Sequence, residues 1–265
     1  MKPAAIFILT LGMMGAHSMP LQAARGAAGS DLQLEEVLAH TRRSVESFWQ
    51  KISSVTCTET LTQQKIGKKG KVEFKHDSVS DYLLITHRKG SDLNLEESRL
   101  VKKNVDKSKE RPLLTTNGFS TLLLVFHPRY RDSYRFYLDG DDLIDGKRLI
   151  RVRYEHIAGT PSTSALELRG RVYPLDMEGV AWIDPDTQAI RRVKAELKAP
   201  MDDLNLKAFY AVVDYQPQRF ASSPEVFWLP STAAIDIETA RQHWRNVHRF
   251  ADYKRFSVEE RIISK

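Results

Sequence analysis

The sequence predicts an α+β fold that is mainly antiparallel β-sheet: a curved, half-open β-barrel of about ten strands. A long N-terminal helix and a second, short helix are expected to cover or plug its open face. Three observations carry this prediction. Residues 31–52 have the apolar spacing of a helix. Most of the remaining chain consists of short strand-like segments separated by turn residues. Connections this short favour an antiparallel meander.

The first residues have the layout of a secretory signal peptide. After a positively charged start, an apolar stretch covers residues 4–16, and small residues stand at Ala23 and Ala24. An uncleaved anchor helix is the alternative, but the stretch is shorter than the roughly 20 residues that span a bilayer. We therefore expect residues 1–23 to be a signal peptide and residues 24–265 to be a single periplasmic domain. No cysteine stands near the cleavage site, so a lipid anchor is not expected.

Residues 31–52 are predicted to form an amphipathic helix. Its apolar residues recur at spacings of three and four, which places them on one face at 3.6 residues per turn. Ser30 or Asp31 is expected to cap the helix, and Glu35 and Glu36 favour its positive end. The apolar positions are Leu34, Val37, Leu38, Thr41, Val45, Phe48, Trp49 and Ile52.

Three strand-like segments follow this helix. Residues 55–66 alternate and are rich in β-branched side chains, and residues 72–88 return after a turn at 67–70. Residues 93–101 are a further candidate strand. The charged run at 102–111 has no periodicity, which predicts a loop.

A second, short helix is predicted after Asn117, which can cap it, and Pro128 ends it. The segment is apolar on more than one side. We therefore expect it to be buried on both faces or to cover an apolar cavity. Its apolar side chains are Phe119, Leu122, Leu123 and Phe126.

The chain beyond residue 131 is predicted to form strands joined by turns. The clearest hairpin turns at 184–187, where Pro185 fixes φ for a type I turn. Another turn is expected at 139–142. The expected strands are 134–138, 148–156, 179–184, 189–198, 206–215, 226–229, 231–238 and about 253–262.

Two strand segments, residues 82–85 and 209–215, are apolar on both faces. An antiparallel strand with one face in water needs only one apolar face. Ordinary core packing against the helices explains this pattern, and so does an open barrel interior lined with apolar groups. The sequence leaves both interpretations open.

Composition and motifs limit the function classes. Cys57 is the only cysteine, which excludes a disulfide framework and a multi-cysteine zinc site. A mean hydropathy of −0.41 with one long apolar run excludes a polytopic membrane protein. The sequence contains no hydrolase, metalloprotease or nucleotide-binding motif, so we expect no catalytic residue, metal site or cofactor.

The basic excess is distributed along the chain. There are 40 Lys and Arg against 34 Asp and Glu, a formal net charge of +6. The denser clusters, at 65–71 and 102–111, lack the interleaved aromatic residues of a nucleic-acid binder, so nucleic acid is not an expected partner. Weak contact with an anionic membrane surface and an ordinary solvated surface are the two interpretations left.

Four short motifs follow one another in an order that resembles a known family. They are VTCTET at 55–60, GVAWID at 179–184, VFWLP at 226–230 and FADYKRF at 250–256. With the signal peptide and two helices, this order resembles the LolA-like periplasmic proteins, the outer-membrane lipoprotein-sorting type. The resemblance implies an incomplete antiparallel β-barrel, plugged by helices around an apolar cavity, and a preference for acyl chains. Residues 102–111 and 159–170 would then be additional loops.

The leading hypothesis is a non-enzymatic periplasmic binding or carrier protein, monomeric, for a lipid or a lipidated protein. The short helix would act as a lid that exchanges protein contacts for lipid contacts. The alternative is a protein-interaction or envelope-sensing module with a filled core and no lipid cargo. The predicted cavity residues are Leu122, Leu123 and Phe126 on the lid, and Phe136 and Trp182 on the sheet.

Overall fold

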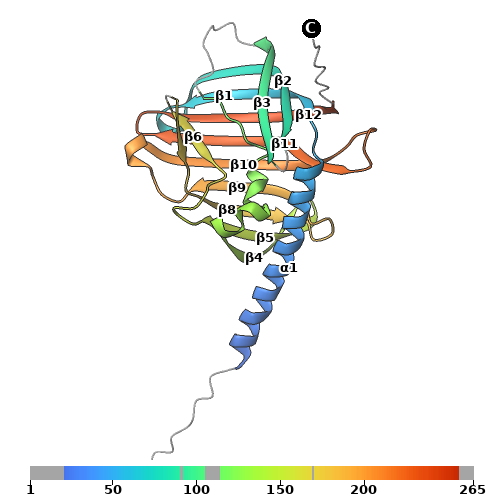
Figure 1. Ribbon diagram of the computed structural model, residues 1–265. Helices are drawn as coiled ribbons and strands as arrows, with labels where there is room; N and C mark the ends of the chain where they lie inside the picture. Colours follow the sequence, from blue (N-terminus) through green and yellow to red (C-terminus); the bar gives the residue numbers. More distant parts are fainter. Residues whose placement is uncertain (1–20, 90–91, 105–113, 169, 257–265) are drawn as a thin grey trace, which may run out of the picture.

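Figure 1 shows the computed structural model of the chain, which describes residues 21–89, 92–104, 114–168 and 170–256. One helix, α1, covers Leu21–Lys51, and four short 3-10 segments follow: η1 Lys68–Gly70, η2 Leu122–Phe126, η3 Pro128–Ser133 and η4 Asp202–Leu204. The strands are β1 Val55–Ile66, β2 Val72–Lys89, β3 Asp92–Asn104, β4 Tyr134–Ile144, β5 Lys147–His156, β6 Ala165–Leu168, β7 Arg171–Pro174, β8 Met177–Ile183, β9 Ile190–Leu197, β10 Leu206–Arg219, β11 Val226–Thr239 and β12 His243–Arg255.

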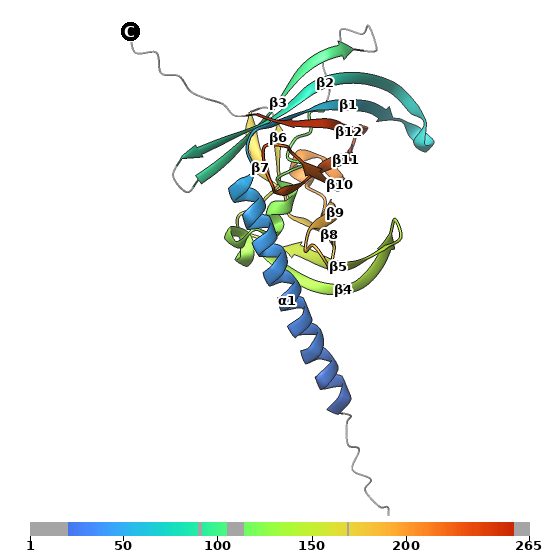
Figure 2. The same ribbon diagram turned by 90° about the vertical axis from the view of Figure 1, so that its right-hand side faces the viewer.

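A single ten-stranded antiparallel sheet dominates the structure. Its strands lie in the order β3-β2-β1-β12-β11-β10-β9-β8-β5-β4, and β6 with β7 forms a separate two-stranded hairpin. The sheet curves strongly, and β3 and β4 remain as its two edges, so it does not close (Figure 2). The mainly antiparallel, ten-stranded, open sheet that the sequence predicts is thereby confirmed.

The α1 helix begins earlier than expected. It starts at Leu21, so Ser30 and Asp31 lie inside it and do not cap it, contrary to the prediction. The preceding residues are rich in alanine, the strongest helix former, which continues the helix past those two positions. Apart from Leu21–Ala23, the predicted signal peptide lies outside the described residues. No helix in the described ranges has an apolar stretch long enough to cross a bilayer.

The prediction of the second helix is wrong in the type of helix and in its first residue. Residues 122–126 form a 3-10 segment, and Asn117 does not cap it. Instead, the side-chain carbonyl of Asn117 accepts a hydrogen bond from Arg99 on β3. The chain turns at Gly118 with a φ of +86°, a conformation open to glycine, before η2 begins. Pro128 ends η2, as predicted, and opens η3.

Several strands are longer than their sequence patterns indicate. β4 continues through 139–142, where a turn is expected, and the chain turns instead at Asp145 and Gly146, whose φ values are 50° and 76°. β11 passes through Pro230 without a break. β12 begins at His243, ten positions before the predicted start at Tyr253.

Two expected loops also contain strand. β3 extends into the charged run as far as Asn104, whereas residues 105–111 of that run lie outside the described residues. The expected loop at 159–170 contains β6, which pairs with β7. Residues 257–262 of the predicted last strand are likewise outside the described part.

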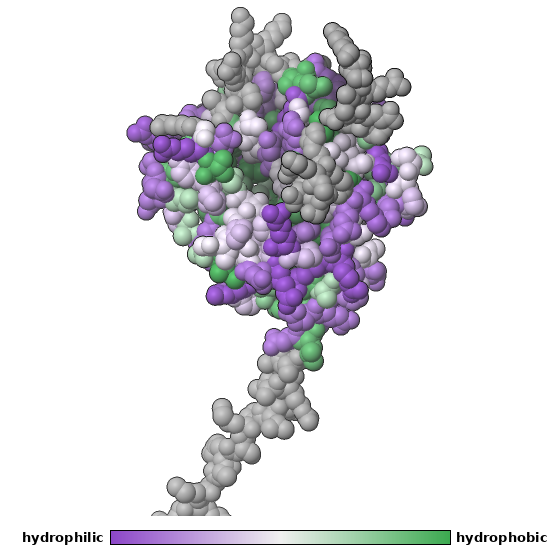
Figure 3. Space-filling model, viewed as in Figure 1, coloured by the Kyte–Doolittle hydropathy of each residue, from purple (hydrophilic) through white to green (hydrophobic). Residues whose placement is uncertain are grey.

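The core lies on the concave face of the sheet, under α1 and η2. Alternation along each strand points Tyr82 and Leu84 of β2 inward and leaves Leu83 half-buried on the outer face. On β10, Val213 and Tyr215 are buried in the same way. The inward members of the two-sided apolar segments are therefore core residues. On the face shown in Figure 3, hydrophilic residues predominate and hydrophobic ones form small separate groups.

Candidate functional site

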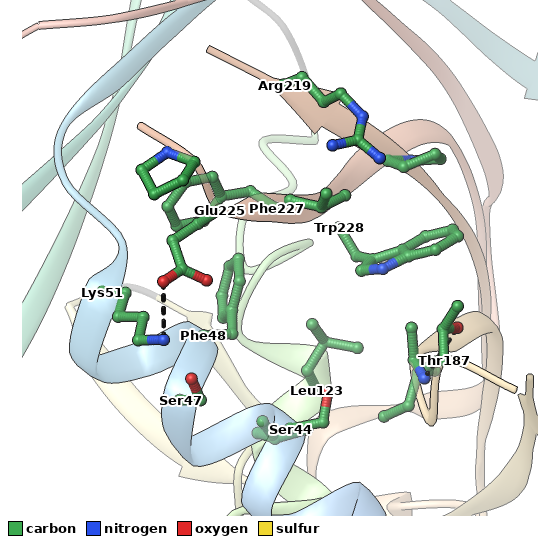
Figure 4. Close-up of a pocket in the computed structure, with 16 residues that line it drawn as sticks. Ser44, Ser47, Phe48, Lys51, Leu123, Thr187, Arg219, Glu225, Phe227 and Trp228 are labelled. Atoms are coloured by element: carbon green, nitrogen blue, oxygen red, sulfur yellow. Dashed lines mark hydrogen bonds and ion pairs between the residues drawn. The ribbon is translucent and has the colours of Figure 1, made fainter. Parts of the chain in front are cut away.

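A cavity of about 620 Å³ lies between the C-terminal half of α1 and one end of β9, β10 and β11 (Figure 4). The spacing of helical residues at i, i+3, i+4 and i+7 turns Ser44, Ser47, Phe48 and Lys51 toward it from α1. The other lining residues come from η2, the β8–β9 turn and the β10–β11 hairpin: Leu123, Thr187, Ala189, Ile190, Pro217, Arg219, Pro224, Glu225, Val226, Phe227 and Trp228, with Val45 of α1.

Apolar side chains make up most of the wall of the cavity. The rings of Phe48 and Phe227 meet edge to face, with 6.4 Å between their centroids, and the ring of Phe220 also packs on Phe227, with 5.8 Å between centroids. Leu123 of η2 and Ile190 of β9 are buried at its base. The cavity therefore borders the main hydrophobic core directly.

Charged groups stand at the mouth. Lys51 Nζ, at the end of α1, lies 2.8 Å from Glu225 Oε1, in the loop that joins β10 to β11. Both side chains are nearly half exposed to solvent, so this ion pair contributes about 0–1 kcal/mol to stability. It nevertheless ties the helix to the loop across one side of the cavity, as Figure 4 shows.

Of the five predicted site residues, only Leu123 lines this cavity. Phe126 is fully buried, and its ring packs on Phe136 with 5.2 Å between centroids. Leu122 and Phe136 are partly buried against the same core. These three residues form the layer behind Leu123, on the side of β4.

Trp182 lies elsewhere. Its strand neighbours Ala181 and Ile183 are fully buried, so the pleat of β8 turns Trp182 to the outer face of the sheet. There its indole N–H donates to Asp142 at 3.2 Å, and the guanidinium of Arg192 lies over its ring at 6.0 Å. We therefore leave Trp182 out of the proposed site.

Most of the cavity wall was not selected from the sequence. Phe227 and Trp228 belong to the VFWLP motif, for which the sequence predicts no binding role, and Phe48 is one of the apolar residues of the predicted helix. Two adjacent aromatic residues where a strand starts were the one local signal available. Their approach to α1 depends on pairings that a single sequence does not state.

A second group of polar side chains is buried on the concave face, away from the cavity. Glu59 of β1 is fully buried, and Arg99 of β3 donates to its two oxygens, Nε to Oε2 at 2.5 Å and Nη2 to Oε1 at 3.0 Å. His248 Nδ1 lies 2.8 Å from Glu59 Oε1, and the Thr116 hydroxyl lies 2.7 Å from His248 Nε2. These contacts are satisfied when Nδ1–H donates to Glu59 and Nε2 accepts from Thr116.

The charges in this group are balanced by Arg99. Burial lowers the pKa of His248, because Arg99 already neutralises Glu59 and a protonated ring would add an uncompensated buried charge. Burial by itself would raise the pKa of Glu59, but the hydrogen bonds from His248 and Arg99 outweigh it, and the pKa is lowered. The group therefore favours a neutral imidazole beside an ionised carboxylate.

This polar group holds the segment that leads into η2. Gln63 Nε2 donates to the Leu114 carbonyl at 2.8 Å, Arg99 Nη2 donates to the Thr116 carbonyl at 2.9 Å, and the Tyr215 hydroxyl donates to the Phe119 carbonyl at 2.7 Å. A hydroxyl–imidazole–carboxylate row also serves nucleophiles in hydrolases. Here these side chains contact the 114–119 segment, and none of them lines the cavity. In this structure their contacts hold the segment that leads into η2.

Comparison with known proteins finds structural likeness at low sequence identity. No protein-family model matches the chain, and no curated protein sequence matches it. Among solved structures, a DUF1329 family protein from Desulfovibrio piger shares 12% identity over 84% of this chain and 92% of that one, with a TM-score of 0.40.

Two further structures carry names related to lipoprotein sorting. A domain assigned to outer membrane lipoprotein sorting from Vibrio parahaemolyticus shares 11% identity over 86% of this chain and 95% of its own, with a TM-score of 0.42. A LolA superfamily protein from Nitrosomonas europaea shares 12% identity over 84% and 97%, with a TM-score of 0.36. The family that the sequence motifs resemble is thus among the matches. At these identities and TM-scores the matches assign no role to this chain.

Proposed function

We propose that this protein binds the apolar tail of a lipid or a lipidated protein in the cavity beside α1 and carries it through the periplasm. The observation that carries the proposal is the cavity itself. Its volume of about 620 Å³ falls within the roughly 300–1,000 Å³ of small-molecule sites, which are concave and mostly apolar. No part of the proposal needs a catalytic group.

The driving force would be hydrophobic. Each methylene of a tail that leaves water contributes about 0.8 kcal/mol, so ten buried methylenes contribute about 8 kcal/mol before the costs of ordering the ligand. Leu123 would lie against the tail at the base of the cavity. Leu122, Phe126 and Phe136, directly behind it, would repack if η2 moves as a lid to admit a longer chain.

Native mass spectrometry tests this proposal. The protein, purified without detergent and incubated with a long-chain monoacylglycerol, is expected to carry one lipid adduct. Leu123→Arg places a charge at the base of the cavity and is expected to abolish the adduct. Leu143→Arg is the matched control, because Leu143 lies near the tip of the β4–β5 hairpin and is 71% exposed.

A second variant guards against misfolding of Leu123→Arg. Ser47→Trp fills the cavity from the surface of α1 without burying a charge, and it is expected to remove the adduct while circular dichroism stays unchanged. If the unmodified protein takes up no lipid, tail binding is wrong and a filled-core interaction module becomes the better description. If both cavity variants retain the adduct, the lipid binds elsewhere.

A further inference from the structure

The cavity carries a positive charge at one end that the described part of the chain does not neutralise. Arg219, the last residue of β10, lines the cavity, and its exposed guanidinium forms no hydrogen bond or ion pair with any residue in the described ranges. Two arginines elsewhere in the sheet are paired with acidic side chains. Arg192 of β9 lies 2.5 Å from Asp214, and Arg245 of β12 lies 2.9 Å from Asp236.

Two further arginines, which do not line the cavity themselves, lie over aromatic rings of its wall. The guanidinium of Arg191 lies 4.7 Å from the ring centroid of Trp228, and that of Arg255 lies 5.9 Å from the ring centroid of Phe227. Arg191 also lies 3.4 Å from Asp184, whereas the Nε of Arg255 donates to the Ser53 hydroxyl.

Few acidic residues line the cavity to balance these cations. Glu225 is the one acidic residue among those that line the cavity, and it is committed to Lys51 at 2.8 Å. The aromatic end of the cavity is therefore electropositive, and Arg219 is the cation free to bind an anion there.

We infer that the cavity takes an amphiphile with an apolar tail and an anionic head group, a carboxylate or a phosphate, and that Arg219 binds the head. This inference rests on the proposed function and adds the chemistry of the ligand to it. Figure 4 shows Arg219 at one end of the cavity and Leu123 toward the other, with Phe48 and Trp228 between them. The tail would therefore run from Arg219 along these two rings toward Leu123.

Guanidinium chemistry suits this role. Its planar fork donates two parallel hydrogen bonds to a carboxylate or a phosphate, and such charge-assisted bonds are stronger than neutral ones. Arg219 is itself exposed, so water and salt screen this attraction, and it weakens as the ionic strength rises. A neutral head group of the same size would leave Arg219 without this partner.

Three probes with the same long acyl chain separate the head group from the tail: a fatty acid, a lysophosphatidic acid and a monoacylglycerol. Their affinities are measured by displacement of a neutral naphthylamine dye from the full protein at neutral pH. At least one anionic probe is expected to bind about tenfold more tightly than the monoacylglycerol. Preference for the fatty acid assigns a carboxylate ligand, and preference for the lysophosphatidic acid assigns a phosphate ligand.

Arg219→Gln is expected to remove this preference, because it weakens binding of the anionic probe about tenfold and binding of the monoacylglycerol by much less. Lys207→Gln, an exposed lysine at the opposite end of β10, is the matched control and is expected to keep the preference. Equal affinities of the unmodified protein for all three probes would overturn the head-group inference and leave tail binding intact. An equal loss for charged and neutral probes in Arg219→Gln would also overturn it. Failure of every probe and of the dye to bind would instead overturn the proposed function.

Discussion

Replacing Arg99 by methionine breaks the buried ion pair with Glu59 from one side. The methionine side chain keeps much of the packing on Tyr82, whose ring lies 5.1 Å from the guanidinium. Glu59 has no exposed surface, so its carboxylate would be left buried with His248 and no cation. Removing one partner of a buried pair costs about 3–5 kcal/mol. For a domain of this size, that loss lowers Tm by about 6–20 °C at neutral pH.

Urea unfolding followed by circular dichroism, with a thermal scan, measures this loss. A double variant, Glu59→Gln with Arg99→Met, removes the orphaned charge and is expected to recover a large part of the stability. The loss in Arg99→Met is also expected to shrink at acidic pH, where protonation of Glu59 removes the charge. A loss below about 1 kcal/mol, or a double variant no more stable than the single one, would refute the assignment of an essential charge balance here.

Three other properties can be checked independently. Because burial lowers the pKa of His248 below its unfolded value of 6.5, the unfolded state binds more protons below that pH. As the pH falls below 6.5, the unmodified protein should therefore lose more stability than His248→Gln, as measured by urea titrations at each pH. If the stabilities of the two proteins change with pH in parallel, the burial of a neutral imidazole is contradicted. Burial raises the pKa of the Cys57 thiol to about 12, so it should resist a thiol reagent at about pH 8 until urea unfolds the chain; rapid native labelling would contradict this. In Gly179→Ala the new Cβ would lie 1.9 Å from the carbonyl oxygen of Lys194, and the strands must separate, at a cost of about 1–3 kcal/mol. In Gly146→Ala the new Cβ meets no atom within 4 Å, but the residue keeps a φ of +76°, which costs about 1–2 kcal/mol. Gly146→Ala should therefore lose less stability than Gly179→Ala. The reverse order of urea midpoints would contradict the close approach of β9 to Gly179.

The strand content could be predicted because alternation and turn residues are local signals. The ends of strands could not, since they depend on the neighbouring strand. β11 continues through Pro230 because the proline stands where the pairing with β10 shifts register, next to Tyr215. A missing backbone N–H is tolerated at such an irregularity, so a proline that signals a break in sequence causes none here.

In the candidate site, too, local patterns could be predicted from the sequence and long-range pairings could not. The burial of Leu123 could be predicted because an unusually apolar segment is buried wherever it packs, whereas its role in binding stays a prediction. Trp182 could not be placed, because an alternating strand has two faces and only its pairing with β5 and β9 decides which one is inward. Arg219 and Phe48 meet at the cavity from β10 and α1, and no local pattern links positions so far apart.

The pairing of β1 with β12 has a consequence for how the chain folds. His248 and Glu59 are 189 positions apart, yet their strands are neighbours in the sheet. Contacts of such high sequence separation slow folding, because a long loop must close before any of them forms. Until β12 docks, β3-β2-β1 and the block from β11 to β4 are separate sheets, each with an unpaired edge open to other chains. A chain cut before His243 would keep both edges permanently, and aggregation rather than a smaller folded domain is its expected fate.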